Sequence, residues 1–182
     1  MKTTNIERYL NSFGQNVVND SKKLLSSKKG STALGKSIRV KVVSTSTGFS
    51  TKFYMLDYGE YLDKGVSGNK TKRSFKNYKG QTESSPGKGY TTKGPPIDIL
   101  SKWIKKKGIK PKGLGRGRSK NTGQYISGFA YLISRKIKRE GIKSLSFFQE
   151  PLGLYYGILQ KNMLKGLRED IQTYITTFYR PK

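Results

Sequence analysis

The sequence predicts an α+β fold, with a small antiparallel β-sheet, an N-terminal helix, central helices, a long C-terminal helical region and long basic loops. Three observations indicate it: apolar residues recur at helical spacing toward both ends of the chain, two short runs alternate with a period of two, and polar, glycine-rich stretches separate them. The 182 residues have the size of one domain. We therefore interpret residues 1–182 as a single domain with an exposed basic loop at about 66–93 and another at about 110–121.

The chain is expected to open with a helix of about 20 residues that lies on the sheet. Thr4-Asn5-Ile6-Glu7 has the spacing of a capping box, which marks a helix start. The apolar residues that follow share one helical face: Ile6, Leu10, Phe13, Val17 and Leu24.

An antiparallel hairpin should follow this helix. Ile38, Val40 and Val42 alternate with basic residues, and residues 44–48 supply a turn. In the second run, residues 49–58, the alternation places Phe53 and Met55 on one face and Tyr54 and Leu56 on the other.

Three further helical segments are predicted. Gly94-Pro95-Pro96 suits a helix start, because a proline in the first turn lacks only an amide that has no intrahelical partner. Its apolar stripe is Ile97, Leu100 and Ile104, with an end at Gly108. A second helix is expected over about residues 122–140, with the stripe Ile126, Phe129, Ala130, Ile133 and Ile137 and a stop at Gly141. Helical spacing continues from Leu152 to Phe178, and we expect a break in it near Gly157.

Basic charge dominates the middle of the chain. Between Lys64 and Lys120, 17 Lys and Arg residues stand against two acidic ones, within a chain of formal net charge +26. This charge predicts an anionic partner, either nucleic acid or an acidic surface of another subunit. We predict partner or DNA contacts at Lys70, Lys72, Arg73, Lys76, Lys79, Lys102, Lys105, Lys106, Arg116 and Arg118.

Aromatic residues near these cations leave two interpretations open. Phe75 and Tyr78, interleaved with lysines, could stack on bases while the lysines pair with phosphates. The same composition suits a charged loop, too polar to pack, whose aromatic residues dock on a neighbouring subunit. Trp103 and the tyrosine-rich C-terminal helix are either binding anchors or, as we expect from their helical spacing, part of the core.

The residue types exclude most catalytic sites. Neither His nor Cys is present, which excludes a His general base, a Cys nucleophile and a Cys/His zinc site. Asp57, Glu60 and Asp63 could meet on one helical turn as a metal site, although we expect solvated charges at the end of the hairpin. Gly87-Lys88-Gly89 and Gly113-Leu114-Gly115-Arg116-Gly117 match neither a P-loop nor a dinucleotide fingerprint. We therefore predict a protein that is not an enzyme and has no cofactor.

A membrane partner is not expected. No apolar run approaches the roughly 20 residues that cross a bilayer, and the N-terminus lacks the hydrophobic region of a signal peptide. We expect the protein to fold in a cytoplasm.

Several motifs occur in a distinctive order. They are Tyr58-Gly59-Glu60-Tyr61-Leu62-Asp63-Lys64-Gly65 after the hairpin, Gly94-Pro95-Pro96 before Leu100, Trp103 and Ile104, Gly108-Ile109, and Ala130-Tyr131-Leu132-Ile133-Ser134-Arg135-Lys136-Ile137 before Gly141-Ile142. In this combination, over residues 6–148, the chain resembles the head-to-tail joining or tail-completion (neck) proteins of tailed bacteriophages. Relatives usually follow the Gly-Ile pair with a proline-rich turn, whereas residues 143–148 contain no proline.

The resemblance implies a structural virion subunit that forms a homo-oligomeric ring at the head–tail junction, connecting portal or adaptor to tail around the DNA channel. It implies other neck, portal-adaptor or tail proteins as partners, non-specific contact with packaged DNA, and synthesis in the host cytoplasm. The alternative is a basic, non-catalytic nucleic-acid-binding protein. A third hypothesis is a metal nuclease that uses Asp57, Glu60 and Asp63.

Overall fold

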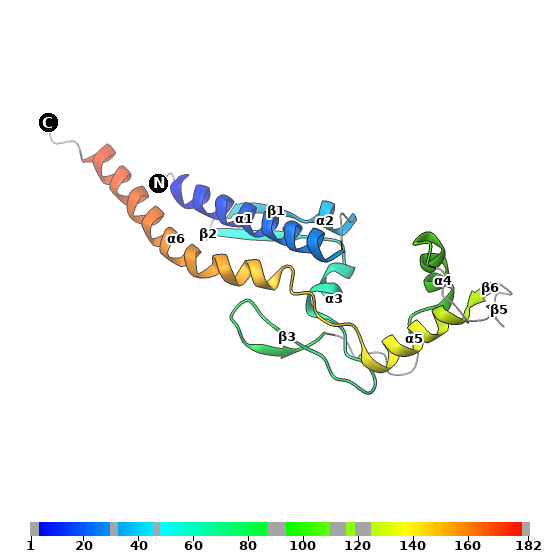
Figure 1. Ribbon diagram of the computed structural model, residues 1–182. Helices are drawn as coiled ribbons and strands as arrows, with labels where there is room; N and C mark the ends of the chain where they lie inside the picture. Colours follow the sequence, from blue (N-terminus) through cyan, green and yellow to red (C-terminus); the bar gives the residue numbers. More distant parts are fainter. Residues whose placement is uncertain are drawn as a thin grey trace. The chain divides into compact units, whose positions relative to one another are not determined.

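The computed structural model describes residues 4–29, 33–45, 48–86, 94–109, 116–118 and 125–179 (Figure 1). The described residues form six helices and three two-stranded sheets, which confirms the predicted α+β fold with helices near both ends of the chain. The chain divides into two compact units: unit 1 contains residues 1–63, 76–82 and 145–182, and unit 2 contains residues 64–75 and 83–144. Because both units draw on separate stretches of chain, this is not a division into consecutive domains. The single domain over residues 1–182 stays a prediction.

Unit 1 combines two long helices with a β-hairpin. α1 (Thr4–Lys29) lies beside α6 (Gln149–Phe178) and against the hairpin of β1 (Arg39–Thr45) and β2 (Gly48–Tyr54) (Figure 1). The strands pair antiparallel along their whole length. The predicted helix on a hairpin is confirmed, although α1, at 26 residues, is longer than expected.

The apolar core of unit 1 lies where α1 meets the hairpin and the short helices α2 (Ala33–Ser37) and α3 (Tyr58–Lys64). Its buried centre consists of Val18, Leu25, Leu34, Ile38 and Phe147. Phe53 and Met55 pack against this cluster, whereas Tyr54 and Leu56 are exposed. The predicted alternation of the second strand is therefore confirmed.

Two buried carboxylates cap the long helices. Asp170 of α6 accepts hydrogen bonds from the backbone N–H groups of Asn5 and Ile6, both at 3.2 Å, at the start of α1. Asp63 of α3 accepts from the backbone N–H of Phe148 at 2.7 Å, at the start of α6. The first N–H groups of a helix have no partner inside it, and its N-terminus is electropositive. Each carboxylate therefore supplies both a missing acceptor and a favourable charge.

α6 runs without interruption over 30 residues, so the predicted break near Gly157 is wrong. The space beside Gly157 is open, so a side chain there would meet nothing within 4 Å of its Cβ. Tyr155, Gly166 and Asp170 contact α1 at successive positions along α6, with Gly166 against the ring of Tyr9. These contacts offset the cost of about 1 kcal/mol that each glycine carries inside a helix.

Unit 2 is built around α5 (Gly128–Glu140), against which α4 (Ile97–Lys106) packs. The predicted stripe of α4 holds: Ile104 is buried, while Lys102, Lys105 and Lys106 are exposed. As predicted, a glycine follows each helix end, Gly108 after α4 and Gly141 after α5, and both have a positive φ.

α5 begins at Gly128 and not near residue 122, which corrects the predicted boundary. β6 (Tyr125–Ser127) precedes it and pairs antiparallel with β5 (Arg116–Arg118). Ile126 therefore lies in a strand and not on the helical stripe. Aromatic and β-branched residues favour strand pairing, and here that pairing prevails over helical spacing.

The loop predicted at about 66–93 contains an isolated bridge residue and a short hairpin within residues 66–86. Val66 and Ile142 exchange backbone hydrogen bonds, with N–H···O distances of 2.9 and 2.8 Å. β3 (Ser74–Lys76) pairs with β4 (Thr82–Ser84), and Val66 and Phe75 are buried. Val66, Phe75 and Ser85 therefore depart from the interpretation of this stretch as too polar to pack, whereas the rest of residues 66–86 is exposed or half-buried. Residues 87–93, 110–115 and 119–121 of the predicted loops, with Gly87-Lys88-Gly89 and Gly113 to Gly115, lie outside the described residues.

Candidate functional site

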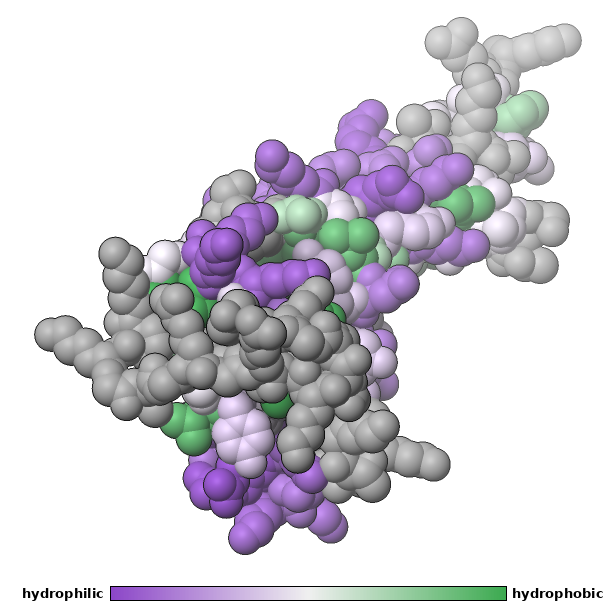
Figure 2. All heavy atoms as spheres, turned by 90° about the vertical axis from the view of Figure 1, so that its right-hand side faces the viewer, coloured by the Kyte–Doolittle hydropathy of each residue, from purple (hydrophilic) through white to green (hydrophobic). Residues whose placement is uncertain are grey.

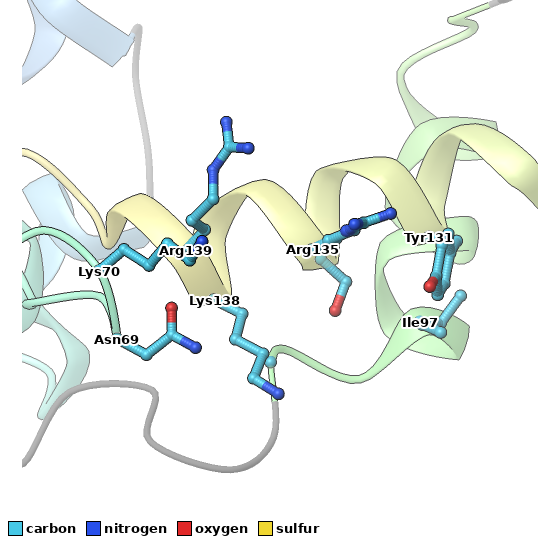
Figure 3. A pocket seen from close by; sticks show the side chains of 9 residues that line it. Asn69, Lys70, Ile97, Tyr131, Arg135, Lys138 and Arg139 are labelled. Carbon is cyan, nitrogen blue, oxygen red and sulfur yellow. The ribbon is translucent and has the colours of Figure 1, made fainter.

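A basic pocket of about 550 Å³ lies in unit 2 (Figure 3). It lies between the start of α4, one face of α5 and the segment that follows Val66. The residues that line it are Asn69, Lys70, Gly94, Ile97, Tyr131, Ser134, Arg135, Lys138 and Arg139.

Helical spacing and backbone hydrogen bonds build the pocket wall. Tyr131, Arg135 and Arg139 follow one another at intervals of four residues, so they project from one face of α5. At the end of α5, the backbone N–H of Asn69 donates to the Lys138 carbonyl at 2.9 Å, and that of Lys70 donates to the Arg139 carbonyl at 3.0 Å. These bonds satisfy carbonyls that the helix end leaves free and hold Lys70 beside α5.

The start of α4 is tied to the same face. The hydroxyl of Ser134 donates a hydrogen bond of 2.7 Å to the Pro95 carbonyl. The predicted Gly-Pro-Pro helix start thus has a second role, since it forms one side of the pocket. Figure 3 shows Tyr131 next to Ile97 at one end and Asn69, Lys70, Lys138 and Arg139 at the other.

The pocket is electropositive because four cations and no carboxylate line it. Arg139 Nη2 donates to Glu140 Oε1 at 2.9 Å, just outside the lining. That hydrogen bond, helped by the charges of Lys136, Arg139 and Arg73, lowers the pKa of the Glu140 carboxyl. Glu140 therefore stays ionised at neutral pH and offsets one of the four charges. Lys70, Arg135 and Lys138 form no ion pair within the part of the chain that the structure describes.

The structure brings one of the predicted contact residues, Lys70, into this pocket. Lys72 and Arg73 lie elsewhere in unit 2, where Arg73 Nε donates to the Glu140 carbonyl, and Lys102, Lys105 and Lys106 are exposed on α4. Lys76 and Lys79 are exposed in the β3–β4 hairpin. The backbone of Arg116 and Arg118 lies in β5, and their side chains lie outside the described set.

Three pocket cations were missed by sequence reasoning, namely Arg135, Lys138 and Arg139. Their signal was available in the spacing of basic residues along the predicted helix of residues 122–140. Lys138 and Arg139 also complement the dipole at the C-terminus of α5, which is a structural role. Arg135 and Lys70 have no such role, so helix stability does not account for the whole cluster.

Phe75 and Tyr78 are packed within the chain and are not free to stack on bases. Phe75 is buried, and Lys64 Nζ lies 5.7 Å from its ring centre. The ring of Tyr78 meets that of Tyr156 edge to face at 5.2 Å, and its backbone N–H donates to Gln149 Oε1 at 3.0 Å. Both aromatic residues of the proposed stacking motif therefore serve the fold.

The three carboxylates near the hairpin do not form a metal site. Asp63 is buried and caps α6, so neither the metal interpretation nor the expectation of a solvated charge holds for it. Asp57 and Glu60 are exposed. Within the described ranges, no group of three or more acidic side chains is arranged to hold a metal ion.

The C-terminal half of α6 carries a second notable surface, an exposed apolar face. Its large residues are spaced by three, four, three and four positions: Leu164, Leu167, Ile171, Tyr174 and Phe178. Leu164 is 71% exposed and Phe178 is 70% exposed, and a groove of about 480 Å³ runs past Leu167, Ile171 and Ile175. We call these five residues the α6 seam. Their spacing is that of the a and d positions of a coiled coil.

The expectation that Trp103 and the tyrosine-rich helix belong to the core is wrong. Trp103 is 45% exposed, and Tyr174 and Tyr179 are exposed as well. On the face drawn in Figure 2, hydrophilic side chains cover most of the described surface and hydrophobic ones stand singly between them. A contiguous exposed apolar seam of this kind suggests a binding surface.

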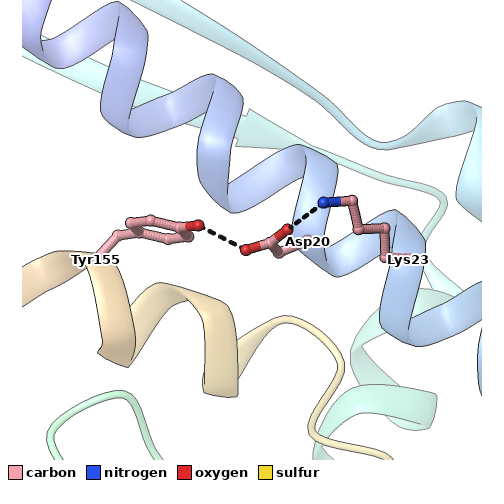
Figure 4. Close-up of polar contacts among 3 residues, drawn as sticks. All are labelled: Asp20, Lys23 and Tyr155. Carbon is pink, nitrogen blue, oxygen red and sulfur yellow. Dashed lines mark hydrogen bonds and ion pairs between the residues drawn. The ribbon is translucent and has the colours of Figure 1, made fainter.

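The opposite face of α6 makes polar contact with α1 (Figure 4). Tyr155 Oη donates to Asp20 Oδ2 at 2.6 Å, and Lys23 Nζ donates to Asp20 Oδ1 at 3.1 Å. The hydrogen bond from Tyr155, followed by that from Lys23, lowers the pKa of Asp20 below its usual 3.8. The same bond to Asp20 raises the pKa of Tyr155 above its usual 10.0.

Comparison with protein-family models, with curated proteins and with solved structures finds no match for this chain. None of the helices in the described ranges is both long and apolar enough to span a membrane.

Proposed function

We propose that this chain is a structural virion protein of a tailed bacteriophage that forms a ring at the head–tail junction. In this role copies of the chain connect portal or adaptor to tail and surround the DNA channel. The order of motifs that resembles neck proteins supports a location at the head–tail junction. The α6 seam is the structural observation that supports assembly of copies into a ring.

The α6 seam supports assembly because it is apolar, contiguous and unpartnered among the described residues. Residues 171–179 are all exposed. Burying one large aliphatic or phenylalanine side chain contributes about 1.5–3 kcal/mol, so the two leucines, the isoleucine and the phenylalanine of the seam would contribute substantially to an interface. The neighbouring copy of the chain is the partner we assign to it, since identical subunits in a closed ring repeat the same contact around an axis.

The basic charge fits the same proposal. A net charge of +26 opposes close approach of copies unless an anion lies between or beside them. Packaged DNA inside a ring, or an acidic neighbouring ring, would supply that anion.

Ring assembly is tested by placing the same charge on and off the seam. Ile171→Lys puts an ammonium group into the α6 seam, whereas Thr173→Lys puts it two positions away on an exposed site of the same helix. We expect the unaltered chain and Thr173→Lys to sediment as one closed oligomer and to show rings in negative-stain images, alone or with a portal. Ile171→Lys should sediment as a monomer with an unchanged circular dichroism spectrum.

Two results would contradict the proposal. One is an unaltered chain that remains monomeric at micromolar concentration with and without a portal. The other is that Ile171→Lys forms the same rings as Thr173→Lys. The α6 seam would then have no role in ring assembly.

A second candidate, a basic nucleic-acid-binding protein that acts without a ring, is favoured by the pocket in unit 2. Its distinguishing property is a steep fall of DNA affinity with added salt in a species that forms no ring. Sedimentation of the chain with DNA at several salt concentrations separates this candidate from the first.

A further inference from the structure

We propose that the basic pocket of unit 2 binds a segment of single-stranded nucleic acid, with phosphates at its cationic end and one base on Tyr131. This goes beyond ring assembly and does not depend on it, because every lining residue belongs to one copy of the chain.

The charge of the pocket selects an anion. Lys70, Arg135 and Lys138 line it without an ion pair among the described residues, and Arg139 adds a fourth cation that shares its charge with Glu140. Three uncompensated like charges around one cavity repel one another, so an anion that enters between them relieves that repulsion. Arginine and lysine side chains are also the usual donors to phosphate oxygens.

The other end of the pocket selects a flat, apolar group. Tyr131 is 50% exposed and lies next to Ile97 (Figure 3). Its ring stacks on no other ring in the part of the chain that the structure describes. An exposed tyrosine ring beside an aliphatic side chain forms a platform on which a base can stack.

Two uncharged polar side chains also line the pocket, Asn69 at the cationic end and Ser134 on α5. The side-chain amide of Asn69 can donate to a phosphate or base oxygen, whereas the Ser134 hydroxyl already donates to the Pro95 carbonyl. The cavity volume of about 550 Å³ is within the range of sites that hold small ligands of nucleotide size.

The combination favours single strands over two other anions. A duplex presents its phosphates outward and keeps its bases stacked inside, so Tyr131 and Ile97 would gain little from it. An acidic protein segment would pair with the cations but would leave the aromatic end without a matching group. A single strand offers phosphates and an exposed base within one nucleotide.

The test measures binding of a fluorescein-labelled oligothymidylate of about 12 nucleotides by fluorescence anisotropy at several salt concentrations. We expect Arg135→Gln with Lys138→Gln to weaken binding at least tenfold and to reduce the salt slope by about one to two. Tyr131→Ser should weaken binding on the order of tenfold with little change of the salt slope. These side chains are largely on the surface, and a circular dichroism spectrum checks that each variant folds.

The matched control removes the same charge from exposed positions of unit 1, as Lys41→Gln with Lys161→Gln. We expect it to change affinity less than twofold. Equal weakening by the control and the pocket variant would show diffuse attraction and overturn the proposal. An unchanged affinity in Tyr131→Ser would also overturn it.

Two competitors decide the class of ligand. A duplex of the same length and polyglutamate should both compete weakly, and neither competition should depend on Tyr131. Stronger binding of polyglutamate than of the oligonucleotide would assign the pocket to an acidic protein instead. The Ile171→Lys variant, measured in parallel, should bind the oligonucleotide as well as the unaltered chain does, which separates failure of the ring from failure of the pocket.

Discussion

Unit 1 and unit 2 are held together in different ways. Unit 1 has a buried apolar cluster around Phe147, and two long helices whose first N–H groups are capped by buried carboxylates. In unit 2 the buried hydrophobic residues that the structure describes are Val66, Phe75, Ile104 and Ala130, which are spread over several elements. Backbone hydrogen bonds between residues 66–71 and the end of α5 carry much of its cohesion.

This difference shows how the chain can carry so much positive charge and still fold. A unit that is stabilised by backbone hydrogen bonds needs few buried apolar side chains. Unit 2 can therefore use basic side chains to line a pocket. Unit 1 depends on side-chain burial and exposes a regularly spaced set of large apolar residues in the α6 seam. Each unit therefore offers one kind of surface: unit 2 a site for an anion, and unit 1 a site for another protein.

The largest loss of stability is expected from a substitution in the apolar core of unit 1. Phe147→Ala removes a fully buried ring from the cluster and should lower the free energy of unfolding by about 3–5 kcal/mol. Chemical denaturation followed by circular dichroism measures this loss. Trp103, the single tryptophan, lies in α4 of unit 2, so its fluorescence reports that unit separately.

The contrast between unit 1 and unit 2 is supported if the circular dichroism transition and the Trp103 fluorescence transition occur at different denaturant concentrations. We expect the circular dichroism transition of Phe147→Ala to move to lower denaturant while the Trp103 transition moves less. Coincident transitions with equal shifts would mean that the units unfold as one cooperative body. Tyr179→Ala, at a position that is 82% exposed and outside the α6 seam, is the control and should leave both transitions within about 0.5 kcal/mol of the unaltered chain.

Much of unit 1 could be predicted from the sequence, because its periodicities are strong. The helical face from Ile6 to Val17 and the alternation around Phe53 both appear in the structure as expected. The caps could not be predicted, since Asp170 reaches Ile6 across 164 residues of sequence. The predicted break at Gly157 failed because propensity describes a helix in isolation, whereas α1 contacts α6 on both sides of Gly157, at Tyr155 and at Gly166 and Asp170.

The middle-sized effect tests the backbone geometry of unit 2. Gly141 has a φ of +73°, and a Cβ there would collide with the Val66 carbonyl and lie 2.6 Å from the Gly68 amide nitrogen. Gly141→Ala should therefore destabilise unit 2 by about 2–4 kcal/mol, through backbone strain and this overlap together. The Trp103 fluorescence transition measures the loss.

Gly108 supplies a control with the same backbone strain and no overlap. Its φ is +65°, but nothing lies within 4 Å of an added Cβ. Gly108→Ala should cost about 1–2 kcal/mol. Equal losses in the two variants would mean that close approach of residues 66–68 to α5 contributes nothing, and the account of unit 2 given above would be wrong.

The candidate pocket was less predictable than the fold. Charge counting identified the basic region, and Lys70 was among the predicted contacts. Which cations meet depends on where residues 69–71 dock on α5, and that docking is made by backbone atoms whose pairing leaves no periodic signal in the sequence. Phe75 and Tyr78 misled the prediction because composition alone does not distinguish a buried ring from an exposed one.

The smallest effect concerns the Tyr155–Asp20 hydrogen bond, which tests whether polar contacts matter in unit 1 beside its apolar core. Because the folded state lowers the pKa of Asp20, this contribution to stability is present above the usual 3.8 and is lost as pH falls through the lowered value. Because the folded state raises the pKa of Tyr155, the contribution of the hydrogen bond is present below the usual 10.0 and is lost as pH rises through the raised value.

Thermal unfolding of Tyr155→Phe should therefore differ slightly from that of the unaltered chain between these two pH limits and converge with it beyond them. Tyr61→Phe, at an exposed position of α3, should show no such window. A Tyr155→Phe difference as large as that of Phe147→Ala would show that unit 1 depends on polar contacts as much as on burial, and the contrast between the two units would fail.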